Sequence, residues 1–260
     1  MTHSASSLAK NETERLRKEL DSETERCLEL SRRLAQTNAQ FEEFVCLAAH
    51  DLREPLREVA SFSQLIAETY AGRLDADADL SLNRIREGAA KAQALVAEVV
   101  DYWASGAGDR PSAPADMEAV LRQALVSCGK LIAERGAVVT SDFLPRVCGD
   151  GGILAKVLHR LIANAVAYSE SPAPRVHISS ERVDSDWVFS VTDDGPGIET
   201  QFQQRIFEPF KRLHGREHPG SGLGLAFCKR AVEWHGGRMR LRSKPGAGST
   251  FYFSLPPAAD

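Results

Sequence analysis

The chain has 260 residues, of which 43% are hydrophobic and 26% are charged, and its formal net charge is −4. This composition is that of a globular protein with enough length for two modest domains. The slightly acidic balance argues against sequence-independent binding to nucleic acid or to an anionic membrane surface. No apolar run approaches the roughly 20 residues of a membrane span, and the N-terminus lacks a secretion signal. The five scattered cysteines include no CxxC pair, which is typical of reduced thiols in a cytoplasmic protein.

The N-terminal third has the pattern of a long helix that pairs with another helix. Apolar or small residues recur at alternating spacings of three and four, and charged or polar residues fill the positions between them. Such a heptad seam predicts a coiled coil, and a single solvated helix is the alternative. The seam consists of Leu16, Leu20, Cys27, Leu30, Leu34, Phe41, Phe44 and Ala48, with polar Glu23 and Thr37 at two further positions.

A second periodic segment follows a break at residues 71–73. Its apolar positions are again spaced by four and three, from Ala78 to Trp103. Two long amphipathic helices joined by a short turn predict an antiparallel hairpin. Because one hairpin with a narrow apolar stripe buries little surface, we expect two copies to pair into a four-helix bundle.

The sequence changes character after residues 104–114, ASGAGDRPSAP, which are typical of a linker. Helices and strands then mix without regular βαβ alternation, which favours an α+β sandwich. Asp150 is a plausible N-cap for a helix that begins at GGILAKV. The expected elements are a helix over 116–134, a strand over 137–143, the helix after Asp150, strands over 175–182 and 186–193, a helix after a glycine-rich stretch, and strands over 238–243 and 249–256.

Two short stretches carry candidate ligand-binding side chains. Asn164 lies within an otherwise apolar helix, LIANAVAYS, and its carbonyl oxygen suits Mg²⁺, although a bond to a neighbouring group is the alternative. Asp193 opens DDGPGI at a strand end and offers an acceptor for an exocyclic amine such as that of adenine. Gly195 and Gly197 allow a tight turn and a close approach to a flat ligand, although many ordinary turns have this pattern.

A third stretch, GSGLGLAFCKR at residues 220–230, places glycines before a helix. Backbone amides and the positive end of the helix dipole suit phosphate there, and a merely flexible loop is the alternative. No GK[ST] follows, so the stretch is not a P-loop. The preceding segment, residues 205–219, suits a mobile lid. Its apolar anchors are Phe207 and Phe210, and its phosphate-side cations are Lys211, Arg212 and Arg216.

The order and spacing of these stretches resemble the N, G1, F and G2 boxes of sensor histidine kinases, within the wider family of gyrase, Hsp90 and MutL ATPases. The resemblance covers about residues 115–257. It implies that Asn164 holds Mg²⁺ and that Asp193 binds the adenine amine, whereas Ala167 stands where the family often has a lysine. The ATP contacts that it implies are Asn164, Tyr168, Asp193, Gly195, Gly197, Ile198, Lys211, Arg212, Gly220, Ser221, Gly222, Leu223 and Gly224.

Residues 44–59, FVCLAAHDLREPLREV, resemble the H box of the same kinases, H-[ED]-L-R-x-P-L. The resemblance implies that His50 accepts the phosphoryl group and that Asp51 orients the ring or takes its proton. Pro55 removes the amide partner of the Asp51 carbonyl, so we expect the helix to be bent or loosened beside His50. Together, the stretches HDLREPLR, RLHGREHPGSGLGLAFCKR and STFYFSLP are most similar to kinase modules attached to phytochrome and PAS sensors.

Together these features predict a multidomain chain. It comprises a coiled-coil helix (1–40), an all-α antiparallel hairpin for dimerisation and histidine phosphotransfer (41–105), a linker (106–114) and an α+β ATP-binding sandwich of the GHKL, or Bergerat, type (115–260).

The predicted function is that of a cytoplasmic, homodimeric protein-histidine kinase of a two-component system. It uses ATP and Mg²⁺ to phosphorylate His50 and passes the phosphoryl group to an aspartate in the receiver domain of a separate response regulator. Residues 1–45 are too few and too polar for a sensor domain, so a separate sensor protein is one open source of input. The alternatives are a catalytically weak scaffold that binds ATP or a partner, and an ATP-driven clamp of the gyrase or Hsp90 type. No nucleic-acid partner is expected.

Overall fold

The computed structural model describes residues 2–106, 108, 110–111, 113–212 and 220–258. The chain divides into two units, residues 1–48 and 49–260. The first unit is helical throughout its described length, and it is the beginning of the 68-residue helix α1 (Thr2–Thr69). No helix in the described part of the chain combines the length and apolarity that crossing a bilayer requires.

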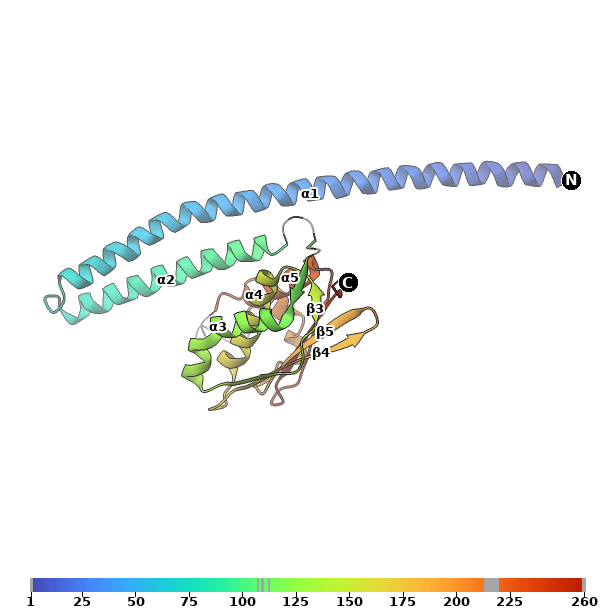
Figure 1. Cartoon of the computed structure of the whole chain (residues 1–260). Coiled ribbons are helices and arrows are strands. Elements are labelled where there is room, and N and C mark those ends of the chain that lie inside the picture. The colour runs from blue at the N-terminus through green and yellow to red at the C-terminus, as the bar shows by residue number, and fades with distance from the viewer. Residues whose placement is uncertain (1, 107, 109, 112, 213–219, 259–260) are drawn as a thin grey trace. The chain divides into compact units, whose positions relative to one another are not determined.

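The second unit begins with a helical hairpin, as predicted. The last part of α1 and helix α2 (Ala76–Ala104) run antiparallel and are joined by a short turn (Figure 1). Gly72 in this turn has φ +69°, a conformation that favours glycine. Asp75 then caps α2, because its side chain accepts a hydrogen bond of 2.8 Å from the amide of Ala78. Pro55 lies inside α1, which continues past it.

Most of the described side chains in the predicted seam of α1 are exposed in the single chain. Large apolar side chains such as Leu20, Leu30, Leu34 and Phe44 are all more than half exposed. A stripe of this kind on one helix gains stability when another helix covers it. Pairing with another helix along the seam stays a prediction, and the physical reason for it is that the exposed apolar side chains would be buried.

Five strands form the main sheet of the second unit, in the order β2-β4-β5-β7-β6. β2 pairs with β4 in parallel, and every other neighbouring pair is antiparallel. The strands are β2 (Val138–Ser141), β4 (Arg175–Val183), β5 (Asp186–Asp193), β6 (Met239–Ser243) and β7 (Ser249–Leu255).

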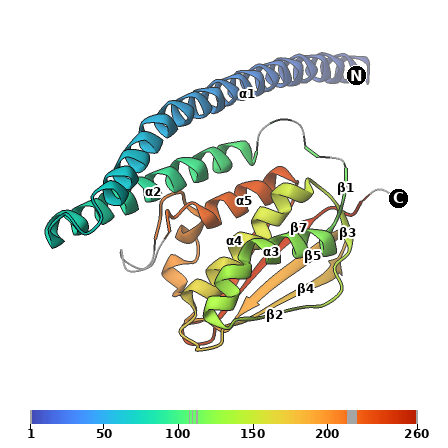
Figure 2. The ribbon, with the colours of Figure 1, turned by 60° about the vertical axis from the view of Figure 1, so that its left-hand side comes forward.

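Three helices cover one face of this sheet (Figure 2). They are α3 (Met117–Arg135), α4 (Gly151–Tyr168) and α5 (Gly224–Trp234), and two short 3₁₀ helices, η1 (Thr200–Phe202) and η2 (Arg205–Phe207), lie between β5 and α5. An all-α hairpin followed by an α+β sandwich is the fold that the sequence predicts, and the structure confirms it.

The core lies between the helices and the sheet. Alternate residues of β7 point into it, as the period of two in a strand requires, and Phe253 stacks on Phe189 of β5 with ring centroids 5.0 Å apart. Cys128 of α3 and Cys228 of α5 are buried there too, and burial raises the pKa of these thiols to about 11 and about 12. All five cysteines are free.

Two short strands were not expected. β1 (Pro114–Asp116) pairs with β3 (Arg146–Cys148) in an antiparallel ribbon outside the main sheet. The sequence predicts that Pro114 belongs to the linker, because proline and small residues are typical of loops. A proline at the first position of a short edge strand is nevertheless tolerated, since the donor that it lacks need not face a partner.

A buried histidine joins the start of α4 to the end of α5. His235 Nδ1 lies 2.7 Å from the carbonyl of Ala231, and Nε2 lies 2.9 Å from the amide of Asp150. A carbonyl can only accept and an amide can only donate, so the ring must be neutral with its proton on Nδ1. Asp150 also caps α4, as predicted, by accepting a hydrogen bond from Ile153. Burial lowers the pKa of His235 below its ordinary 6.5.

This depressed pKa predicts that the second unit loses stability in mild acid. The unfolded state takes up a proton at His235 as the pH falls below 6.5, whereas the folded state resists it. The free energy of unfolding should therefore fall by up to about 1.4 kcal/mol per pH unit in this range. Urea unfolding of the wild type, measured from about pH 7.5 to about pH 5.5, should reveal this slope. His235→Gln should reduce the slope and the exposed control His177→Gln should keep it; equal slopes in both variants would contradict the assignment.

Candidate functional site

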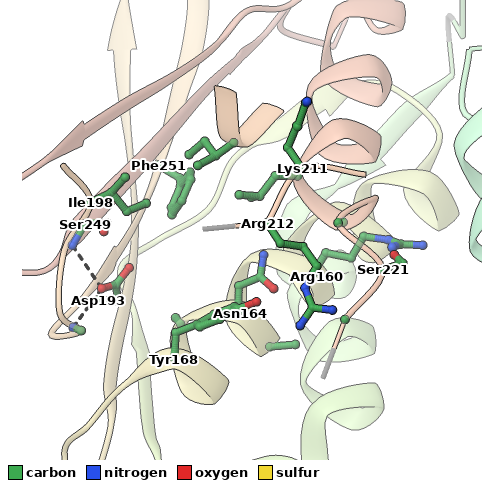
Figure 3. Close-up of a pocket in the computed structure, with 18 of the residues that line it drawn as sticks. Arg160, Asn164, Tyr168, Asp193, Ile198, Lys211, Arg212, Ser221, Ser249 and Phe251 are labelled. Atoms are coloured by element: carbon green, nitrogen blue, oxygen red, sulfur yellow. Dashed lines mark hydrogen bonds between the residues drawn. The ribbon is translucent and has the colours of Figure 1, made fainter. Parts of the chain in front are cut away.

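A cavity opens between α4, the end of β5 and the loop before α5 (Figure 3). Asp193 lies at one end of it, Arg160 and Ser221 lie at the other, and Asn164 lies between them. All of the predicted ATP contacts line the cavity except Leu223, whose side chain is buried in the interior.

Helix α4 contributes three side chains from one stripe. Arg160, Asn164 and Tyr168 are spaced by four residues, so they follow one another along the same side of the helix. Leu158 and Ile162 on the other side are fully buried in the core. The helix therefore presents its polar stripe to the cavity because its apolar face is held by the sheet.

Asp193 is a half-buried carboxylate held by the backbone. Its Oδ1 accepts hydrogen bonds from the amides of Gly195 at 2.9 Å and Ser249 at 3.1 Å. Oδ2 accepts no hydrogen bond from any residue that the structure describes, and it is available to a ligand. Burial raises the pKa of Asp193 above its ordinary 3.8, and the neighbouring Asp194 adds to this, against the lowering effect of the two amides.

Two glycines are required by the backbone around the cavity. Gly197 has φ +73°, and a Cβ there would lie 1.9 Å from the carbonyl oxygen of Lys244. Gly222 has φ +78°, and a Cβ there would lie 2.8 Å from the carbonyl oxygen of Lys211. A side chain at either position would force the neighbouring backbone away, so both glycines keep the cavity walls close.

The predicted lid is only partly described. Lys211 and Arg212 line the cavity, as expected of phosphate-side cations, and Arg216 lies outside the described residues. Phe207 is half-buried with its ring centroid 6.4 Å from that of Phe251, which fits an apolar anchor. The prediction is wrong for Phe210, whose side chain is exposed while its backbone amide bonds the carbonyl of Gly222.

Asn164 is suited to an external ligand. Its half-buried side chain makes no hydrogen bond to any described residue, so the alternative that it merely bonds a neighbour finds no support. The described residues also contain no group of three or more His, Cys, Asp or Glu side chains that could hold a metal ion. A Mg²⁺ ion in this cavity would need phosphate oxygens and water among its ligands, and Asn164 could offer one amide oxygen.

The His50–Asp51 pair lies on an exposed surface of α1. The two side chains are 78% and 83% exposed, and His50 Nδ1 lies 3.3 Å from Asp51 Oδ1. When Nδ1 carries the proton and donates it to this carboxylate, Nε2 is unprotonated and faces solvent. The arrangement leaves a nucleophilic nitrogen accessible to a second molecule or domain.

Several lining residues were not predicted from the sequence, among them Arg160, Glu98, Ser249 and Phe251. The first could have been found, because Arg160 is a cation one helical turn before Asn164 on the same side of a largely apolar helix. Ser249 and Phe251 are successive inward-facing positions of β7. The sequence shows that they lie on the same face of the strand, but it does not show that this face borders the cavity. Glu98 comes from α2, and no local pattern connects it to the cavity.

Comparisons with known proteins agree with this geometry. Residues 149–259 match the family described as histidine kinase-, DNA gyrase B- and HSP90-like ATPases. Cyanobacterial phytochrome A of Nostoc sp. is 40% identical over 229 residues, which are 88% of this chain and 30% of that protein. Sensor-like histidine kinase SenX3 of Mycolicibacterium smegmatis is 32% identical over 238 residues, which are 87% of this chain and 60% of that protein.

A solved structure extends the likeness to the helical hairpin. Full-length ShkA, crystallised in complex with AMPPNP, superposes with a TM-score of 0.67 at 29% identity, over 84% of this chain and 46% of that one. The chain thus spans less than two thirds of the length of these relatives. The match covers both the hairpin and the α+β sandwich, in the same order along the chain.

The raised pKa of Asp193 predicts how the binding of adenosine depends on pH. An ionised carboxylate at this position would accept a hydrogen bond from the adenine amine, and protonation of the free Oδ2 would turn that acceptor into a donor. Affinity should therefore fall as the pH drops through a pKa that lies above the ordinary 3.8 of aspartate. Calorimetric titration with adenosine over a pH series measures this directly.

Two variants distinguish the protonation of Asp193 from a general loss of folded protein at low pH. Asp193→Asn should weaken adenosine binding by about tenfold or more and flatten the pH profile. The matched control is Asp194→Asn, because Asp194 does not line the cavity but raises the pKa of Asp193. It should keep the affinity and move the profile to lower pH. A wild-type affinity that is independent of pH would refute the role of Asp193.

Proposed function

We propose that this chain, which belongs to the histidine kinase family, phosphorylates its own His50 with ATP and Mg²⁺ and passes the phosphoryl group to a response regulator. The observation that carries the proposal is the exposed His50 with Asp51 at its Nδ1, in a chain that also has an ATPase-family domain. The acceptor of the second transfer would be an aspartate in a separate receiver domain.

The nucleophile would be Nε2 of His50. An imidazole attacks phosphorus only through an unprotonated nitrogen, and Asp51 favours the tautomer that keeps the proton on Nδ1. The N–P bond forms as the bond between the γ-phosphorus and the bridging oxygen breaks, and ADP leaves. As the ring becomes positively charged, the Asp51 carboxylate stabilises the Nδ1 proton or takes it.

The cavity would position the nucleotide for this transfer. Asp193 offers its free oxygen to the adenine amine at one end, and Lys211 and Arg212 place positive charge at the cavity wall. Tyr168 and Ile198 add apolar surface against which a flat base can pack. Most of the rate would come from positioning and from charge on the phosphates, because phosphoryl transfer asks little covalent chemistry of the protein.

The residues present fit a Mg²⁺ ion carried in with the nucleotide. Asn164 offers one oxygen ligand, and octahedral Mg²⁺ commonly keeps several waters and phosphate oxygens besides. When bound, the ion would neutralise charge on the phosphates that leave and transfer. The contribution of the chain is to hold the amide oxygen of Asn164 toward the cavity from the rigid helix α4.

The assembly would be a homodimer formed through the hairpin and the exposed seam of α1. In this proposal, residues 1–40 form a signalling helix and residues 41–105 form the dimerisation and histidine phosphotransfer domain. Residues 106–114 are a linker, and residues 115–260 bind ATP. The exposed apolar side chains on α1 and α2 supply the contact surface for a second copy. We propose a cytoplasmic location, with input from a separate sensor protein or from further parts of the same protein.

Incubation with γ-labelled ATP and Mg²⁺ tests the proposal. The wild-type chain should become labelled with a phosphoryl group that is acid-labile and alkali-stable, and His50→Gln should abolish the label. Asp51→Asn should slow labelling by about 10²-fold, because it removes the charge that orients the ring. The matched control is His177→Gln, since His177 is another exposed histidine beside a carboxylate, Asp142, and it should label normally.

The alternatives predict different outcomes. A scaffold would bind ATP without labelling, and an ATP-driven clamp would hydrolyse ATP without labelling His50. Label that persists in His50→Gln would place the acceptor elsewhere and overturn the assignment. Addition of a receiver domain to the labelled chain then tests the second transfer, through loss of label from His50 and its appearance on the receiver.

A further inference from the structure

Arg160 is a nearly buried cation at the wall of the cavity. Its side chain is only 14% exposed, and its guanidinium carbon lies 4.5 Å from the centroid of the Phe227 ring. Its Nη1 lies 3.9 Å from the place that a Cβ on Gly224 would occupy, beside the first residue of α5. A guanidinium is costly to bury without anionic partners, so its partners identify its role.

The two anionic partners of Arg160, Glu98 and Asp101, both come from α2. Glu98 Oε2 lies 3.7 Å from Nη1 of Arg160, and Asp101 Oδ2 lies 3.4 Å from Nη2. Charge-assisted hydrogen bonds of good geometry are nearer 2.8 Å, so these contacts are loose. Asp101 has its shorter contact with Lys156, at 2.7 Å. The five N–H donors of Arg160 are therefore not saturated by the two carboxylates, and they remain competent to bind another anion.

Glu98 stands at the edge of the same cavity. It lines the cavity, and its carboxylate also accepts a hydrogen bond from the hydroxyl of Ser221 in the glycine-rich loop. One carboxylate thus contacts both the cation on α4 and the loop expected to close over phosphate. A polyphosphate entering here would be repelled by Glu98 and attracted by Arg160, because like charges repel and opposite charges attract most strongly where water is scarce.

The sequence has Ala167 where a lysine is common in the family, so one cation expected from α4 is missing. Arg160 supplies a cation from the same helix, on the stripe that faces the cavity. We propose that Arg160 binds the nucleotide phosphates and that Glu98 competes with them for its guanidinium. The inference rests on the proposed function and adds both a binding residue and its competitor.

Competition of this kind couples the nucleotide to α2. When phosphate takes Arg160, its ion pairs with Glu98 and Asp101 are lost, and of the ion pairs between α2 and α4 in the described residues only Lys156–Asp101 is left. By linkage, a state of the hairpin that favours the pairing of Arg160 with α2 must weaken ATP binding by the same factor by which bound ATP disfavours that state. The ion pair would thus let the state of the hairpin set the affinity for ATP.

Calorimetric titration of the full chain with ATP and, separately, with adenosine tests the inference. Adenosine lacks phosphates, so it reports the adenine end alone. Arg160→Gln should weaken ATP binding by about tenfold or more and leave adenosine affinity unchanged. Glu98→Gln should strengthen ATP binding by about threefold or more, because the competing charge is removed. In the double variant the Glu98 substitution should bring a smaller gain than in the wild type, because only the direct repulsion of the phosphates is removed and no guanidinium remains to be released.

Lys156→Gln is the matched control. Lys156 is the neighbouring cation on α4 and also pairs with α2, but it does not line the cavity, so its loss should not weaken ATP binding. Equal weakening of ATP and adenosine binding by Arg160→Gln would overturn the inference, because it would mean that the guanidinium acts through its packing on Phe227. An unchanged or weakened ATP affinity in Glu98→Gln would overturn the competition.

Failure of the proposed function has a different signature. A wild-type chain that binds neither ATP nor adenosine would overturn the nucleotide site itself, and this inference with it. A wild-type chain that binds ATP and adenosine equally would leave the adenine end standing and overturn only the role of Arg160.

Discussion

The burial of one face of α4 against the sheet is the constraint on which the cavity depends. Leu158 and Ile162 are fully buried on that face. The helical period then places Arg160, Asn164 and Tyr168 along the opposite stripe, one turn apart. A cation, an amide and a phenol are thereby held at fixed spacing by a core that contains none of them. Displacement of α4 would move all three side chains together. The geometry of the site therefore depends on the packing of α4 in the core.

Features that depend on local chemistry were predictable from the sequence. Asp150 caps α4 because a carboxylate before an apolar helix satisfies a backbone amide, wherever the helix lies in the fold. Asp193 and Gly197 form a strand end and a tight turn for similar reasons, and their order in DDGPGI is enough to suggest an amine acceptor beside a close backbone approach. The α+β arrangement followed from the irregular order of helices and strands.

Features that depend on contacts between distant segments were not predictable. Nothing in the sequence near Glu98 indicates that its carboxylate meets Arg160, because the pair joins two helices in the folded chain. The ribbon of β1 and β3 is equally non-local, since each strand is too short to have a period of its own. Phe210 was expected to anchor the lid because it is aromatic, but the backbone at this position has φ +62° and its side chain is exposed.

The two core thiols give the second unit an internal reporter of its packing. Cys128 and Cys228 stay protonated at neutral pH and have no access to solvent, so an alkylating reagent should pass them by in the folded chain. Cys27 and Cys46 on α1 are exposed and open to the reagent. Cys148 on β3 is only partly buried, so the alkylation of Cys128 and Cys228 themselves, identified by mass spectrometry, would report that the packing of α3 and α5 has opened. A variant whose site has failed could thus be told apart from one whose core has opened, without any nucleotide being added.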